Sequence, residues 1–169
     1  MLPTSHTGLE ETVPVLRALV ELYQKAEREN QEELKIWADY ALHWSCRRLE
    51  IFRPKVKVSK AAKAKAKKMK IGDISQYSWA DQTHKKKMRD TGRAIFHYEH
   101  VYPVSQLRNA LLSLVSSTDE EVFELIQKMD IAWILKEECA LLDKNGYRSQ
   151  RPEEDLWRPF RELGIEMEP

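Results

Sequence analysis

The chain has 169 residues, of which 42% are hydrophobic and 33% are charged, and its formal net charge at pH 7 is +1. This composition is typical of a single globular domain, here residues 1–169, and argues against a disordered or fibrous protein. No segment approaches the roughly 18 consecutive apolar residues of a transmembrane helix, and the N-terminus lacks the basic flank and apolar run of a signal peptide. We therefore expect a cytoplasmic protein with no membrane partner.

The positive charge is concentrated in residues 53–93, which hold 14 of the 28 basic residues but only 3 of the 27 acidic ones. Clustered lysine and arginine release counterions from a phosphate backbone, so we expect this segment to protrude from the domain and bind DNA or RNA. Two alternatives stay open. The segment either binds an acidic protein, or is neutralised by the acidic remainder of the chain, which would also permit self-association.

Two helices are predicted before residue 53. The first follows Pro14, where Leu16, Leu19, Val20 and Tyr23 recur at helical spacing. Asn30 and Glu33 resemble a capping pair that begins the second helix. Its apolar residues form one stripe: Trp37, Tyr40, Ala41, Trp44 and Leu49. The two helices become antiparallel if the chain turns near residues 29–31.

The basic segment is predicted to contain two short helices. Residues 59–70 are rich in alanine and lysine and lack an apolar stripe, so this helix should project into solvent. Ser78 and Asp81 resemble a capping box that opens a second helix, which ends at Gly92. Tyr77 and Trp79 lie between the two and either stack on bases or anchor the segment. Nucleic-acid contacts are predicted for Lys60, Lys63, Lys65, Lys67, Lys68, Lys70, Lys85, Lys86, Lys87, Arg89 and Arg93.

A strand is predicted for residues 94–102, which are aromatic and β-branched and precede Pro103. The apolar run 131–135 is either a second strand or the start of a helix. Helical patterns cover residues 105–115, the segment after Thr118, residues 136–143 and residues 152–164. The predicted fold is mainly α, or α+β if both apolar segments are strands.

Functional residue types gather in HYEHVYP, residues 97–103. The order of an acidic residue, His, two apolar residues and Pro resembles the first strand of the HNH, or ββα-metal, nucleases. That resemblance implies a divalent metal, Mg²⁺ or Mn²⁺, held by Glu99, with His100 as the general base that activates water for attack on a phosphodiester. His97 shares a strand face with Glu99 and is a second candidate metal ligand.

The rest of the HNH motif has no counterpart, since no histidine follows His100. The alternative interpretation is structural, with His100 among the core residues of a strand and His97 and Glu99 as a surface pair. Cys46 and Cys139 lie far apart without Cys-x-x-Cys spacing, so both are predicted to be buried structural thiols.

The leading hypothesis is therefore a nucleic-acid-binding protein that acts through residues 53–93, with metal-dependent cleavage at Glu99 and His100 as its catalytic extension. The alternative is a non-catalytic inhibitor or adaptor. Such a protein would use the basic segment and the aromatic helix of Trp37 and Trp44 to bind an acidic protein partner.

Overall fold

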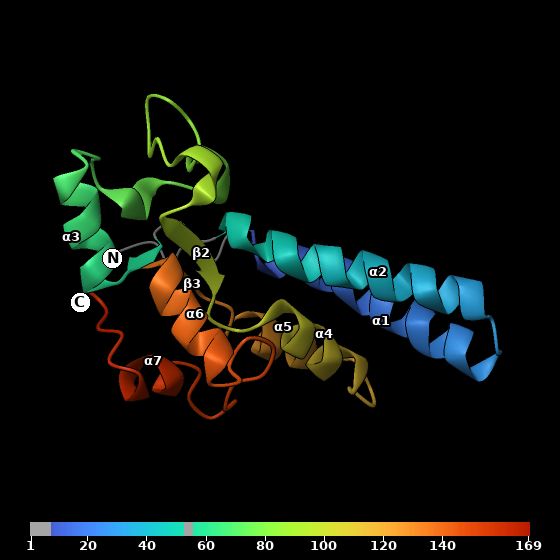
Figure 1. The fold of residues 1–169 in the computed structure, drawn as a ribbon. Coiled ribbons are helices and arrows are strands. Elements are labelled where there is room, and N and C mark those ends of the chain that lie inside the picture. The colour runs from blue at the N-terminus through green and yellow to red at the C-terminus, as the bar shows by residue number, and fades with distance from the viewer. Residues whose placement is uncertain (1–7, 53–55) are drawn as a thin grey trace, which may run out of the picture. The chain divides into compact units, whose positions relative to one another are not determined.

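A computed structural model describes residues 8–52 and 56–169 (Figure 1). These residues form seven α-helices and one three-stranded sheet, which confirms the predicted fold class. The chain divides into two compact units: unit 1 comprises residues 1–52 and 102–129, and unit 2 comprises residues 53–101 and 130–169. Within the described residues, no helix combines the length and apolar character that crossing a bilayer requires.

Unit 1 is a set of four helices: α1 (Val13–Arg28), α2 (Glu32–Arg48), α4 (Val104–Leu112) and α5 (Asp119–Ile126). The predicted turn between α1 and α2 is present, with Asn30 in a left-handed conformation at φ 55°. The N-terminus of α5 is capped by Thr118, whose hydroxyl accepts from the Glu121 N–H while the Glu121 carboxylate accepts from the Thr118 N–H. Leu16, Val20, Leu42, Leu107, Leu111, Val122 and Ile126 form the buried core of this unit.

The aromatic stripe of α2 does not face this core. Trp37, Tyr40 and Trp44 are 58%, 64% and 45% exposed, and the buried positions of the helix are Ala38, Leu42 and Cys46. Small side chains at two of these three positions allow neighbouring helices to approach closely, which bulky indole rings would prevent. The aromatic residues of the predicted stripe therefore lie on the outer face of α2, whereas Leu49 lies beyond the helix and is buried.

Unit 2 is built on a small sheet with strand order β1 (Lys57–Val58), β3 (Ile131–Leu135), β2 (Phe96–His100). The central strand β3 runs parallel to β1 and antiparallel to β2. All five β3 residues are buried, as expected for a strand covered on both faces. The structure thus resolves residues 131–135 as a strand, and residues 166–168 extend the β1 edge through a bridge between Ser59 and Met167.

Three helices belong to unit 2: α3 (Lys60–Lys68), α6 (Lys136–Lys144) and α7 (Arg158–Glu162). The start of α3 is tied to the start of α6 by buried side chains. The Ser59 hydroxyl accepts from the Ala62 N–H at 3.0 Å and donates to the Glu138 carboxylate at 2.7 Å. The same Glu138 oxygen accepts from the Leu135 N–H at 2.7 Å, so one carboxylate caps α6 and anchors the cap of α3.

α3 packs against β3 and buries Ala62 and Ala66, rather than projecting freely into solvent as its composition suggested. It ends in a Schellman motif, in which the Ile71 N–H donates to the Ala66 carbonyl at 3.0 Å. Lys70 occupies the left-handed position of this motif at φ 55°, where glycine is usual. Lys70 therefore closes the helix, at the end of the range predicted from the sequence.

The helix predicted to run from Ser78 to Gly92 is wrong beyond its first turn. The Asp81 carboxylate does accept from the Ser78 N–H at 2.9 Å, but a single 3-10 turn at Trp79–Asp81 is all that follows. The segment is instead organised by Asp90, which is 1% exposed. Its carboxylate accepts from the Gln82 side chain and from the N–H groups of Ala94, Ile95 and Phe96 at 2.8–3.1 Å.

Candidate metal centre and basic face

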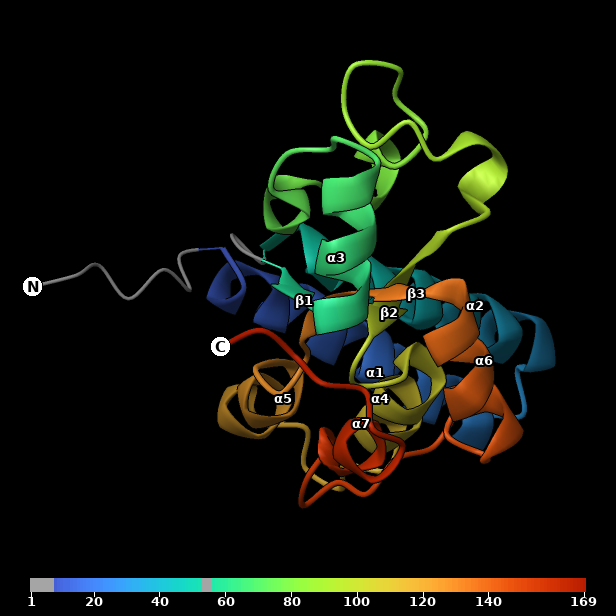
Figure 2. The same ribbon diagram turned by 60° about the vertical axis from the view of Figure 1, so that its left-hand side comes forward.

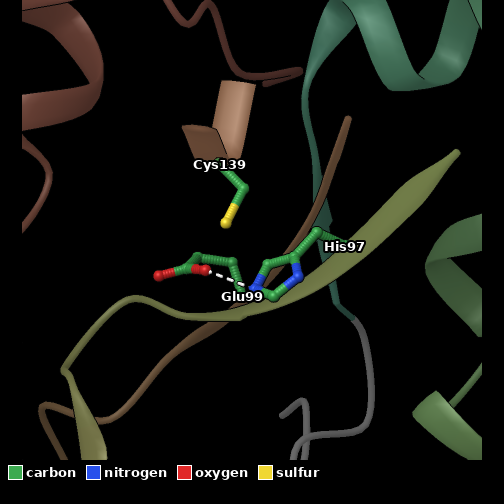
Figure 3. A group of neighbouring side chains, drawn as sticks. All are labelled: His97, Glu99 and Cys139. Carbon is green, nitrogen blue, oxygen red and sulfur yellow. Dashed lines mark ion pairs between the residues drawn. The ribbon is translucent and has the colours of Figure 1, made fainter. Parts of the chain in front are cut away.

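His97 and Glu99 lie on one face of β2 because side chains two residues apart in a strand point the same way. The imidazole Nε2 and the Glu99 Oε2 are 2.8 Å apart (Figure 3). The alternation along β2 thus brings together the two residues that the sequence analysis proposed as metal ligands.

Arg151 holds the opposite side of the Glu99 carboxylate. Its side chain is fully buried and pairs with Glu99 Oε1. The guanidinium also donates to the carbonyls of Tyr147, His100 and Val101 at 2.8–3.1 Å. Sequence reasoning missed this residue, because nothing in the sequence links an arginine in a long irregular segment to a strand 52 positions earlier.

Cys139 is the third polar group at this site, and it comes from α6. The donor atoms of His97, Glu99 and Cys139 all lie within 4.8 Å of one another. Figure 3 shows the sulfur and the carboxylate on the same edge of the imidazole, the edge of Nε2. Cys139 is half-buried, so the prediction of a buried structural thiol is fulfilled by Cys46 and not by Cys139.

The ionisation of the His97–Glu99 pair follows from its surroundings. Burial lowers the pKa of His97, but hydrogen bonds with Cys139 and Glu99 raise that pKa more, to about 9 from the ordinary 6.5. Burial raises the pKa of Glu99, but the hydrogen bond from His97 and the charge of Arg151 bring the net pKa below its ordinary value. At neutral pH His97 is therefore an imidazolium and Glu99 is a carboxylate, which also pairs with the Arg151 guanidinium.

His100 does not join this group. It lies on the other face of β2 beside Tyr98, with ring centroids 6.5 Å apart, and Tyr98 packs against Trp133 of β3. The Glu99 and His100 side chains, which the HNH resemblance pairs as metal ligand and general base, therefore point to opposite faces of the sheet.

The basic residues within 56–93 fall into two main groups. The first group is engaged within the unit: Lys60 and Lys63 pair with Glu166 and Glu168, Lys87 pairs with Asp81, and Arg93 stacks on the Trp79 ring at 3.5 Å. The Tyr77 carbonyl accepts from the Trp133 indole, so the Tyr77 backbone serves as an anchor to the core. Acidic residues of the chain thus neutralise part of the basic segment, which is one of the alternatives raised by the sequence, but they neutralise only part of it.

The second group has exposed side chains and no ion pair among the described residues. It consists of Lys65, Lys67, Lys68, Lys70, Lys85 and Lys86. We call these six lysines the basic face. Figure 2 shows the chain between α3 and β2 as short turns and loops. Within it, Arg89 joins the end of α3 to the turn that carries Lys85 and Lys86, because its side chain donates to the carbonyls of Met69 and Lys70 at 3.1 and 2.9 Å.

Comparison of this chain with protein-family models, with curated proteins and with solved structures found no match. The geometry and chemistry described above are therefore the basis for the functional proposals below.

Proposed function

We propose that unit 2 is a nucleic-acid-binding module that contacts phosphates through the basic face. The observation that carries this proposal is the joining of two separate lysine clusters by Arg89, which brings six exposed lysines without acidic partners to one region. Clustered ammonium groups of this kind bind a phosphate backbone with release of its counterions. Phosphodiester cleavage by Glu99 and His100 has less support, because their side chains point to opposite faces of β2.

The test is binding of fluorescently labelled DNA and RNA, single- and double-stranded, across a salt series. Each neutralised phosphate of duplex DNA contributes about −0.9 to the slope of log K against log salt, so six lysines set a slope of up to about −5. Absence of binding at low salt would overturn the proposal. So would equal affinity for polyglutamate of the same length, which would favour an acidic protein partner.

Two substitutions separate binding from folding. Lys70→Gly removes a charge and at the same time relieves a left-handed conformation that costs about 1 kcal/mol, so the variant should bind more weakly while unfolding at higher temperature. Lys68→Gln should make the salt slope shallower by about 1. Lys144→Gln, an exposed lysine of α6, is the matched control and should leave the slope unchanged. A wild-type slope in Lys68→Gln and Lys70→Gly together would contradict the basic face as the binding surface.

A second candidate function, self-association, is favoured by the outer face of α2. Along this face Ile36, Trp37, Tyr40 and Trp44 are all at least 45% exposed. Glu33 precedes Tyr40 by seven residues and Arg47 follows it by seven, so both lie at the ends of the same face. If the α2 helices of two copies pack antiparallel with their Tyr40 side chains at the centre, each Glu33 lies beside the partner's Arg47. The same packing covers the aromatic rings of both helices.

Sedimentation over a range of concentrations tests this idea. We expect a dimer that Tyr40→Glu converts to a monomer. Glu33→Arg alone and Arg47→Glu alone should each weaken the dimer, and the double variant should restore it because the exchanged charges again meet their opposites. A wild-type monomer at every concentration, or no recovery in the double variant, would rule out this mode of association.

A further inference from the structure

We propose that His97, Glu99 and Cys139 form a Zn²⁺ site in unit 2, with Nε2, Oε2 and Sγ as its three protein ligands. The three donor atoms lie within 4.8 Å of one another and come from one strand and the helix that packs on it. Zinc bonds of about 2.0–2.3 Å place tetrahedral ligands roughly 3.3–3.8 Å apart. Side-chain movements of about 1 Å therefore suffice to bring the three donor atoms to bonding distance from one ion.

The chemical types of the three donor atoms indicate which metal ion the site should bind. A thiol is a soft ligand that suits Zn²⁺, whereas Mg²⁺ takes oxygen ligands in octahedral geometry. Cys139 therefore argues against Mg²⁺ or Mn²⁺, the metals that the HNH resemblance implies. Three protein ligands leave the fourth tetrahedral position to water or a substrate, the pattern of catalytic rather than structural zinc sites.

The arrangement around the carboxylate supports a metal ligand. Arg151 pairs with Oε1 of Glu99 and is itself fixed by three backbone carbonyls, so it holds the carboxylate with Oε2 turned toward His97 and Cys139. Outer partners of this kind commonly orient metal-binding carboxylates. The Nε2 proton now donated to Oε2 is the one that a metal ion would replace.

A cysteine nucleophile activated by histidine fits this geometry less well. Such an arrangement uses one imidazole nitrogen for the thiol and the other for the orienting carboxylate. Figure 3 shows both the Cys139 sulfur and the Glu99 carboxylate at the Nε2 edge of the ring, with Nδ1 turned away from them. Convergence of three donors on one point is instead what a metal ion requires.

The experiment titrates the metal-free full-length chain with Co²⁺, which reports its ligands by absorption, and then displaces it with Zn²⁺. We expect one equivalent of Co²⁺ to produce thiolate-to-metal charge-transfer absorption and the intense visible bands of a four-coordinate ion. Cys139→Ser should abolish the charge-transfer absorption, and His97→Asn should lower Zn²⁺ affinity by more than about 100-fold. Cys46→Ser and His100→Gln are matched controls, because neither residue belongs to the site, and both should retain wild-type binding.

A second measurement does not depend on folded variants. Bound Zn²⁺ should slow alkylation of Cys139 in the wild-type chain, while Cys46, which is fully buried, stays unreactive with or without the metal. The proposal is overturned if Co²⁺ gives no charge-transfer absorption with the wild-type chain, if Cys139→Ser retains that absorption, or if Zn²⁺ leaves the alkylation rate of Cys139 unchanged.

Discussion

At the scale of single residues, the buried ion pair of Glu99 and Arg151 shows why the sequence predicted only part of the candidate site. His97 and Glu99 were predictable as neighbours, since strand alternation places them on one face. Arg151 and Cys139 were not, because their approach depends on β2 pairing with β3 and on α6 following β3. Local spacing therefore identified two of the proposed ligands, and the tertiary structure places Cys139 and Arg151 beside them.

Replacement of Arg151 should be severely destabilising. Arg151→Met removes the guanidinium that compensates the buried Glu99 carboxylate, and we expect a loss of about 3–5 kcal/mol in the free energy of unfolding, measured by urea denaturation. Arg161→Met is the control. It breaks an exposed pair with Asp155, which water and salt screen, and should therefore cost much less than the loss of Arg151. Equal losses for the two variants would contradict the role assigned to burial.

The buried thiol of Cys46 should make stability depend on alkaline pH. Burial raises its pKa to about 12 from the ordinary 9.0. Above pH 9 the unfolded thiol therefore ionises while the folded thiol stays neutral, so stability present below pH 9 is lost as pH rises toward 12. The free energy of unfolding should fall by at most about 1.4 kcal/mol per pH unit from this group.

Urea denaturation between about pH 8 and pH 11 measures this dependence. Cys46→Ala should have a flatter profile than the wild type, because it removes the buried thiol whose pKa is raised. If the profile of Cys46→Ala has the wild-type slope, ionisation of Cys46 does not contribute to it.

At the scale of elements, capping and periodicity located most helices, and tertiary contacts decided which faces they bury. The helical pattern after Pro14 predicted α1, and the helical pattern after Thr118 predicted α5. The aromatic residues Trp37, Tyr40 and Trp44 do lie on one face of α2, but that face is exposed. Periodicity shows that a helix has an apolar face without showing what covers it. The failure at residues 82–92 has a different cause, because Gln82 bonds Asp90 through both its side chain and its carbonyl, which closes the segment into a loop that a helix could not form.

Asp90 should therefore control the order of its whole loop. Asp90→Asn keeps the size of the side chain but removes the charge from an acceptor of three backbone N–H groups, and we expect a loss of about 2 kcal/mol. Hydrogen exchange should quicken across residues 82–96. Asp73→Asn provides the comparison, because the Asp73 carboxylate accepts from the Ser75 N–H near the protein surface and should cost less than about 1 kcal/mol. Unchanged exchange in the Asp90 variant would contradict this account.

At the scale of the whole molecule, each unit is assembled from two separate stretches of chain. The sequence predicted β2, left β3 open between a strand and a helix start, and did not predict β1 or the strand order, because pairing between segments more than 30 residues apart leaves no local pattern. Each unit also has its own buried residues, with Leu16 in one core and Trp133 in the other. The two units should therefore lose protection separately when one core is damaged.

Trp133→Ala tests this separation. The indole is fully buried, packs on the Tyr98 ring at 4.7 Å and donates to the Tyr77 carbonyl, so its loss should cost about 3–5 kcal/mol. Hydrogen exchange should quicken in residues 56–101 and 130–169 and stay slow in 8–52 and 102–129. Leu16→Ala should give the reverse pattern. Uniform loss of protection in both variants would show that the units unfold together.

The central position of β3 also matters while the protein is being made. Strands β1 and β2 are synthesised before residues 131–135, so neither has its sheet partner at that time. At about 5–20 residues per second, the chain from residue 101 to residue 131 takes roughly 2–6 s to synthesise. During this interval the lysine-rich segment also lacks Glu166 and Glu168, which pair with it in the finished protein. Unit 2 therefore closes only after residues 131–135 have been made, and Lys60 and Lys63 stay unpaired until Glu166 and Glu168 follow.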